Sequence, residues 1–279
     1  MSIRIIADTM CDVPEEFVRR YNIKVMPLKV HFGEESFLDG IDITAEEFFE
    51  RLAKVDELPK TSQVTPLEFI KAFSEELEKG NTIITVLGSS HLSGTYNSAV
   101  LAKQQLGNKN IYIIDSEAIT LGAGMLVIKA ARLAEEGKSA EEIVRTIEES
   151  KKRMRQFLII GDLKYIYKGG RISFSASVIG SILNIKPILT MTDGKLEMIE
   201  KSRGVKKAIY ILLNAIKDKG WTLNDKIIGI NHTLCPEYAD YFEELIKDEY
   251  HVKEIIRGKV GSVVGTHAGP GCVAFYFEV

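Results

Sequence analysis

Cysteine is scarce in this sequence. Only Cys11, Cys235 and Cys272 occur in 279 residues; they lie far apart, and no C-x-x-C pair is present. The odd number and wide spacing argue against a disulfide framework and against a zinc site. Such a sequence suits a reducing compartment, so we expect a cytoplasmic protein that holds no metal and no other cofactor.

Long apolar runs and an excess of basic residues are also missing. No run approaches the roughly 18 apolar residues of a membrane span, and the opening MSIRIIADTMCD has the pattern of a short strand rather than a signal peptide. Lys and Arg number 36 against 39 Asp and Glu, which gives a formal charge of −3. Because nucleic-acid-binding proteins usually carry a basic surface, we expect no nucleic-acid partner.

In the first half of the chain, apolar strand-like runs alternate with amphipathic helical segments. The runs at 3–8 and 82–87 are strand-like, and Thr44 with Glu47 has the spacing of a capping box at the start of a helix. This alternation predicts an N-terminal three-layer domain over residues 1–153 with a mainly parallel sheet. In such sheets ligands bind beyond the carboxyl ends of the strands.

The second half has a different pattern. Asp193-Gly194 stands between two apolar runs, which is the signal of a β-hairpin and favours antiparallel pairing. We therefore expect a C-terminal α/β domain over residues 154–279 with a mixed or antiparallel sheet. The length of the chain suits two domains.

The stretch GSSHLSGTYNSA, residues 88–99, contains many neutral hydrogen-bonding groups where we expect a strand to be followed by a helix. Ser93 falls at the expected start of a helix over 93–106, where free backbone N–H groups favour an anion. A simple N-cap role explains the same serine. The stretch alone leaves three functions open: a serine nucleophile, a phosphate cradle, or a holder for another anion.

Two further polar stretches can reach the same edge of the sheet. Thr61 and Ser62 stand in PKTSQVTP, which we expect to be a loop leading to a helix, although turn formation and capping explain this cluster equally well. His267 lies between glycines in GTHAGPG, where we expect a sharp turn before the last strand. The alternative is a solvated histidine in a tight turn.

A basic residue and an apolar segment follow the short helix expected at 163–168. Arg171 in KGGRIS can bind an anion or an acidic partner, or cap carbonyl groups. The run at 174–184 has apolar residues at helical spacing with small residues between them, which is typical of a core helix. It can also leave room for an apolar ligand.

The motifs of two enzyme classes are absent. Ser93 lacks the G-x-S-x-G elbow of serine hydrolases, because His91 stands where the first glycine belongs. Neither G-x-x-x-x-G-K-[ST] nor a dinucleotide G-x-G-x-x-G follows a strand. A serine hydrolase or acyltransferase using Ser93, with His267 as base, remains the alternative function.

The chain resembles the DegV family over essentially its whole length, through ADTMCDVP, PKTSQVTP, GSSHLSGTYNSA, IIDS, GDLKYIYKGGRIS and GTHAGPG. The resemblance implies a two-domain bacterial protein of phospholipid metabolism that binds a long-chain fatty acid. It implies a non-catalytic carrier, the acyl-binding subunit of fatty acid kinase, whose partner subunit supplies ATP and phosphoryl transfer. Transient contact with a membrane fits the same role.

The resemblance also assigns roles to residues. The family's carboxylate-binding positions fall on Thr61, Ser62, Ser93 and His267, and basic positions expected to meet the kinase subunit fall on Arg171 and Arg203. One departure lies in TMCD, where the commoner version has serine, so that a hydroxyl contact there would fall to Thr9.

Overall fold

The first of the three sheets is parallel and forms the centre of the N-terminal half. The computed structural model describes residues 2–172 and 185–279, so the expected apolar helix at 174–184 lies outside the described residues. The strand order is β2-β1-β6-β7, and all its pairings are parallel. The strands are β1 (Ile3–Asp8), β2 (Lys24–Met26), β6 (Thr82–Leu87) and β7 (Ile111–Asp115).

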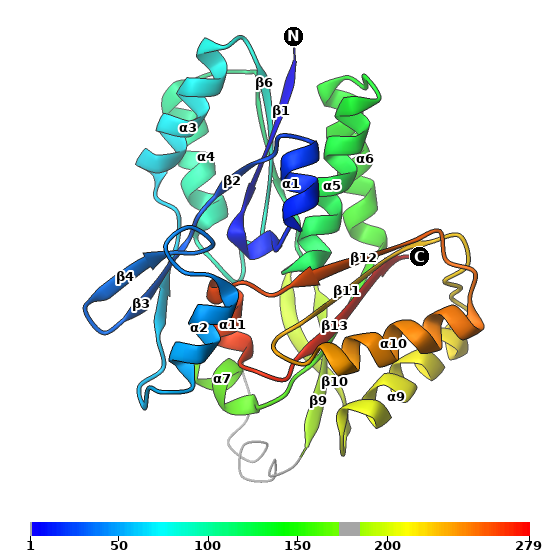
Figure 1. The fold of residues 1–279 in the computed structure, drawn as a ribbon. Helices are drawn as coiled ribbons and strands as arrows, with labels where there is room; N and C mark the ends of the chain where they lie inside the picture. Colours follow the sequence, from blue (N-terminus) through cyan, green and yellow to red (C-terminus); the bar gives the residue numbers. More distant parts are fainter. Residues whose placement is uncertain (1, 173–184) are drawn as a thin grey trace.

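Helices cover both faces of this sheet (Figure 1). One layer holds α3 (Pro66–Glu78) and α4 (Thr95–Leu106). The opposite layer holds α1 (Glu15–Arg20), α5 (Leu121–Glu135) and α6 (Ala140–Arg153), and a short 3-10 helix η1 (Thr9–Cys11) follows β1. The three-layer arrangement with a parallel sheet, predicted from the alternation of segments, is therefore confirmed.

A small antiparallel sheet lies beside the first one, and the sequence did not predict it. Its order is β4-β3-β5, with β3 (Lys29–Phe32), β4 (Glu35–Leu38) and β5 (Lys60–Ser62). Helix α2 (Ala45–Leu52) begins at the predicted capping box, in which Thr44 and Glu47 bond each other's backbone. Thr61 and Ser62, expected in a loop, lie in strand β5, because the three-residue strand forms only by pairing with β3.

The third sheet belongs to the second half and is mixed, as expected. The order is β10-β9-β8-β13-β11-β12, in which only the β11–β12 pairing is parallel. The strands are β8 (Met154–Ile159), β9 (Lys186–Thr192), β10 (Lys195–Ser202), β11 (Ile227–His232), β12 (Glu254–Lys259) and β13 (Val273–Glu278). Asp193 and Gly194 both have positive φ and form the predicted hairpin turn between β9 and β10.

Four helices accompany this sheet in the described residues. They are α7 (Leu163–Lys168), α9 (Val205–Asp218), α10 (Pro236–Glu249) and α11 (Ser262–Ala268). Figure 1 shows α9 and α10 side by side, away from the N-terminal half. Because α6 ends at Arg153 and β8 begins at Met154, a domain boundary after residue 153 stays our prediction.

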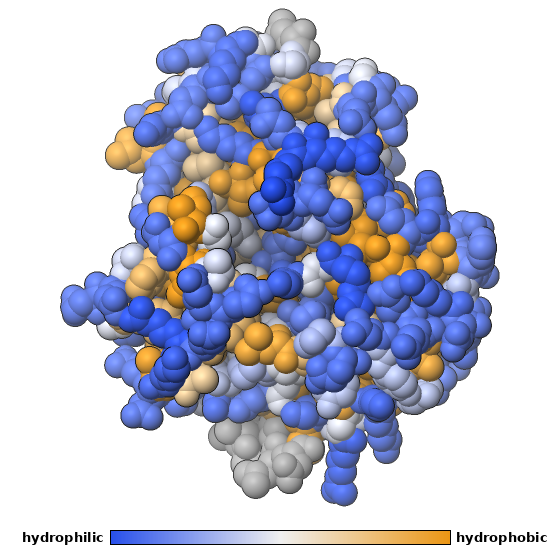
Figure 2. Space-filling view, viewed as in Figure 1, coloured by the Kyte–Doolittle hydropathy of each residue, from blue (hydrophilic) through white to orange (hydrophobic). Residues whose placement is uncertain are grey.

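One of the hydrophobic clusters spans both halves of the chain, and a second one lies within the second half. Helix α5 packs against the parallel sheet through β1 and against the mixed sheet through β11 and β13, and one buried cluster runs from Ile5 to Tyr276. Polar side chains cover most of the face in Figure 2, and apolar ones appear there as separate patches. Among residues 2–172 and 185–279, no helix is long and apolar enough to cross a membrane.

Candidate functional site

The candidate site lies at the carboxyl ends of β1 and β6. The chain proceeds from β1 to β2 on one side and later places β6 and β7 on the other side, so the connections leave in opposite directions and open a crevice between β1 and β6. Met10 follows β1, and Leu92, Ser93 and Gly94 follow β6; all four line a cavity there. The cavity thus lies at the edge of the parallel sheet where a ligand is expected to bind.

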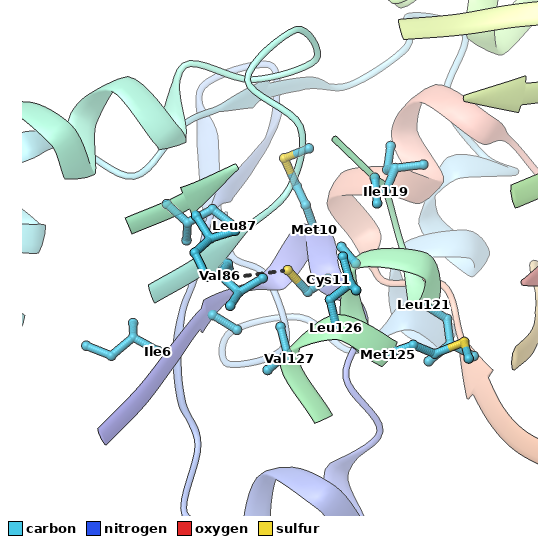
Figure 3. Close-up of a cluster of buried hydrophobic side chains, with 14 of the residues drawn as sticks. Ile6, Met10, Cys11, Val86, Leu87, Ile119, Leu121, Met125, Leu126 and Val127 are labelled. Atoms are coloured by element: carbon cyan, nitrogen blue, oxygen red, sulfur yellow. Dashed lines mark hydrogen bonds between the residues drawn. The ribbon is translucent and has the colours of Figure 1, made fainter. Parts of the chain in front are cut away.

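The cavity has a volume of about 310 Å³ and is mainly apolar, at the small end of the range of small-molecule sites. Its apolar lining includes side chains from both halves of the chain: Met10, Leu28, Ile119, Leu158, Ile160, Ile166, Leu196 and Val263. Figure 3 shows Met10 pointing away from the neighbouring Cys11, which turns into the core toward Val86. Met10 thus lines the cavity, while its neighbour Cys11 is fully enclosed in the core.

Several residues that line the cavity carry polar side chains. Thr61, Ser62, Ser93 and His267 all line it. The Thr61 hydroxyl and His267 Nε2 lie 3.0 Å apart, although the two residues are separated by 206 positions in the sequence. Tertiary structure therefore brings the strand β5 and the helix α11 together at the polar part of the cavity.

The other two hydroxyls have partners of their own. Ser62 Oγ lies 2.9 Å from His31 Nε2. Ser93 Oγ accepts a hydrogen bond from the Thr95 backbone N–H at 3.2 Å and lies 2.9 Å from the Thr95 hydroxyl. These bonds restrict the rotamers of the hydroxyls, so that they are already arranged when a ligand arrives.

His267 is neutral over the physiological range. Burial, with a smaller contribution from the charge of Arg171, lowers the pKa of His267 to about 3. Arg171 also lines the cavity, but its guanidinium donates to the carbonyls of Gly169 at 2.6 Å and Leu92 at 3.4 Å. The polar part of the cavity thus combines neutral donors with one partly engaged cation.

Gly169, the first glycine of KGGRIS, leaves space for the imidazole ring of His267. Gly169 ends helix α7, and a Cβ atom on it would overlap His267 Nδ1. That nitrogen is buried and has no hydrogen-bond partner among residues 2–172 and 185–279. A side chain at position 169 would therefore displace the imidazole.

Comparison with known proteins assigns the chain to a family. The profile of the DegV family matches residues 2–279. The chain belongs to the DegV family. A DegV domain-containing protein of Caldanaerobacter subterraneus is 41% identical over 276 residues, which cover 99% of this chain and 98% of the relative.

Two solved DegV structures share the whole fold. The structure of a DegV family protein from Thermus thermophilus, described for its fatty acid binding, has a TM-score of 0.93 at 29% identity and covers 100% of this chain and 99% of its own. DegV from Bacillus subtilis, a fatty acid binding protein, has a TM-score of 0.84 at 34% identity, with coverage of 100% and 99%. Both of these similar proteins are thus described as binding fatty acids.

The structure corrects two local expectations. His267 does not lie in a tight turn: it is in the last turn of helix α11, and the positive φ angles fall on Gly269 and Gly271 behind it. Ser93 does not start α4, because the helix begins at Thr95 with Gly94 as its N-cap. Ser93 precedes this N-cap and is among the residues that line the cavity.

Arg171 and Arg203 are not equivalent in the structure. Arg171 lines the cavity, whereas Arg203 is exposed between β10 and α9 and is not among the lining residues. Both arginines are exposed, and of the two only Arg171 also lines the cavity.

Thr9 accepts a hydrogen bond from the Leu28 backbone N–H at 3.1 Å and supports the chain before β3.

Sequence reasoning missed His31 and Met10. His31 stands in an alternating strand and Met10 directly follows one, and the spacing of neither residue has a distinguishing feature. Only the pairing of β3 with β5 brings His31 to Ser62. Within the described ranges, no group of three or more His, Cys, Asp or Glu side chains could hold a metal ion.

Proposed function

We propose that this protein binds one long-chain fatty acid, with the tail in the apolar cavity and the carboxylate at Thr61, Ser62, Ser93 and His267. The observation that carries the proposal is the hydrogen-bonded pair of Thr61 and His267 at an otherwise apolar cavity. The fatty acid binding of the similar solved structures supports it.

The division of labour between tail and head group follows from energetics. Burial contributes about 0.8 kcal/mol for each methylene group, so most of the affinity comes from the tail. Neutral hydroxyls fix the carboxylate without pairing both of its oxygens as a bidentate arginine does. One carboxylate oxygen thus stays available for a reaction.

The proposed fate of the ligand is phosphorylation by a separate kinase subunit. A carboxylate oxygen attacks the γ-phosphorus of ATP on that partner; the new O–P bond gives an acyl phosphate, and ADP leaves with the electron pair of the broken bond. This chain contributes no catalytic group to the step. It binds and presents the acyl chain.

The alternative of a serine hydrolase finds no support in the site geometry. A serine nucleophile needs its base within hydrogen-bond reach. His267 Nε2 bonds Thr61, and Ser93 bonds Thr95. No hydrogen bond joins Ser93 to His267 in the described part of the chain.

Ligand binding is tested by native mass spectrometry and by palmitate titration of delipidated protein. Thr61→Val removes the hydroxyl at almost unchanged volume, and a lost hydrogen bond to a charged group costs about 1.5 to 3 kcal/mol. We therefore expect Thr61→Val to bind palmitate at least about tenfold more weakly than the wild-type protein does. Unchanged affinity in Thr61→Val would place the carboxylate elsewhere, and a protein that never takes up palmitate would refute the proposal.

Partner docking is tested separately at Arg203. Because Arg203 is exposed and lies outside the cavity lining, Arg203→Glu should spare palmitate binding while reversing a charge that can steer an acidic partner. With a cognate kinase and ATP, we expect acyl phosphate formation to fall strongly. A normal rate would exclude Arg203 from the docking surface. Arg171→Glu is a poorer probe, because it also alters the cavity.

A further inference from the structure

Ser62 has a partner that the proposed carboxylate site does not include. His31 on β3 is paired with Lys60 on β5, and Ser62 follows two residues later on the same strand. Residues two apart in a strand face the same side, and diagonal neighbours across two strands lie within reach of a long side chain. The imidazole therefore reaches Ser62 Oγ, at 2.9 Å, through the register of the sheet.

Thr61 has a matching imidazole on the other face of β5. It is paired with the fully buried Val30 and reaches His267 Nε2 on helix α11. Each of these two adjacent residues, both of which line the cavity, thus has its own imidazole: His31 for Ser62 and His267 for Thr61.

The direction of these hydrogen bonds decides what the hydroxyls offer to a ligand. A hydroxyl has one hydrogen to donate. If the ring Nε2–H donates to the hydroxyl oxygen, the hydroxyl hydrogen is free for the head group. If the hydroxyl donates to the ring, only its lone pairs face the ligand. A carboxylate only accepts hydrogen bonds, so it requires the first arrangement.

The surroundings of His267 favour this first arrangement. Its Nδ1 is buried without a partner in the part of the chain that the structure describes, and a proton there would leave an N–H donor unsatisfied, which is costly. In a neutral ring the proton then lies on Nε2, the nitrogen that faces Thr61. The Thr61 hydrogen is left to point into the cavity.

We propose that His31 is a positioning residue that donates from Nε2 to Ser62 and turns the Ser62 hydroxyl hydrogen toward the ligand's carboxylate. Together with His267 and Thr61, it makes the site selective for fatty acids over neutral lipids with the same tail. This inference rests on the proposed function.

The test compares palmitate with hexadecanol, which has the same number of carbons and no carboxylate. Both are titrated into delipidated wild-type protein, His31→Ala, His31→Gln, Ser62→Ala and the double variant. Loss of an oriented donor to a charged group should weaken palmitate binding by about tenfold in His31→Ala. Hexadecanol, which can donate as well as accept, should change by less than about twofold.

The pairing with Ser62 gives a second readout. In the Ser62→Ala background, His31→Ala should cause no further loss, because the imidazole acts only through the hydroxyl. The amide of His31→Gln can still donate and should restore most of the affinity. His251→Ala, at an exposed position, serves as the matched control, and melting temperatures show that each variant is folded.

Three results would overturn the inference: equal losses for palmitate and hexadecanol, a further loss in the double variant, or wild-type affinity in His31→Ala. A wild-type protein that binds neither lipid would instead refute the proposed function, and the two failures are thereby distinguished.

Discussion

Ser89 Oγ donates a 2.6 Å hydrogen bond to the Gly194 carbonyl oxygen across 105 positions of sequence. Ser89 is fully buried in the loop after β6, and Gly194 is the buried tip of the β9–β10 hairpin. A Cβ atom on Gly194 would lie 2.8 Å from Ser89 Oγ and 2.9 Å from His91. The hairpin of the second half is thus fitted against the loop that carries Ser93.

The first prediction concerns this contact. Ser89→Ala should lower the free energy of unfolding by about 1 to 3 kcal/mol, because it leaves a buried carbonyl without its donor. Gly194→Ala should also destabilise the protein, through backbone strain and overlap. Gly137→Ala is the control: Gly137 has the same φ of 77° but open space around it. Urea unfolding that gives equal losses at positions 194 and 137 would show that the fit at the hairpin tip contributes nothing.

The second prediction concerns the protonation of His267. Because its pKa is lowered to about 3, mainly by burial, the ring should stay neutral from pH 8 down to about pH 4. The folded state binds the second ring proton of His267 less tightly than the unfolded state does. The contribution of the neutral ring to the free energy of unfolding is therefore fully present above about pH 6.5 and is lost as the pH falls toward 3. NMR signals of the ring, assigned with His267→Gln, should show Nε2–H and no titration near pH 6.5. A midpoint near that pH would contradict the burial argument.

The third prediction concerns the room that Gly169 leaves. Gly169→Ala places a methyl group where His267 Nδ1 lies, so the ring must move away from Thr61. We expect palmitate affinity to fall by about tenfold, comparable to the loss of one hydrogen bond to a charged group. Gly258→Ala is the control, since its Cβ would meet its nearest neighbour, Leu121, at an ordinary 3.5 Å. Full affinity in Gly169→Ala would mean that the position of the ring is unimportant.

The fourth prediction concerns Asp8, at the end of β1. Burial raises the pKa of Asp8 to about 7, so the folded state holds this proton more tightly than the unfolded state. Its favourable contribution is complete below about pH 4 and is lost as the pH rises through about 7. Asp8→Asn cannot titrate and should gain stability relative to wild type between pH 4 and pH 7. Denaturant unfolding at several pH values measures this difference, and a constant difference would exclude Asp8 as the titrating group.

Several features were predictable from the sequence because they depend on neighbouring residues. The capping box at Thr44 forms as its spacing predicts, since it needs only residues three positions apart. The Asp193-Gly194 turn forms because both residues tolerate positive φ. The resemblance to DegV proteins selected Thr61, Ser62, Ser93 and His267, which all line one cavity. That these residues bind a carboxylate, and that a kinase receives the ligand, stay predictions.

The sequence by itself determined the local elements, the alternation of strands and helices, and the family. Tertiary structure alone decided the environment of the site residues. Strand β5 exists because it pairs with β3, and that pairing brings His31 to Ser62. Helix α11 contains a glycine and is too short to be stable alone; the Asp39 carboxylate, 223 positions away, accepts from the Ser262 N–H at its start, at 2.9 Å. A pattern of adjacent residues cannot show such contacts, because their stability comes from partners that only folding brings together.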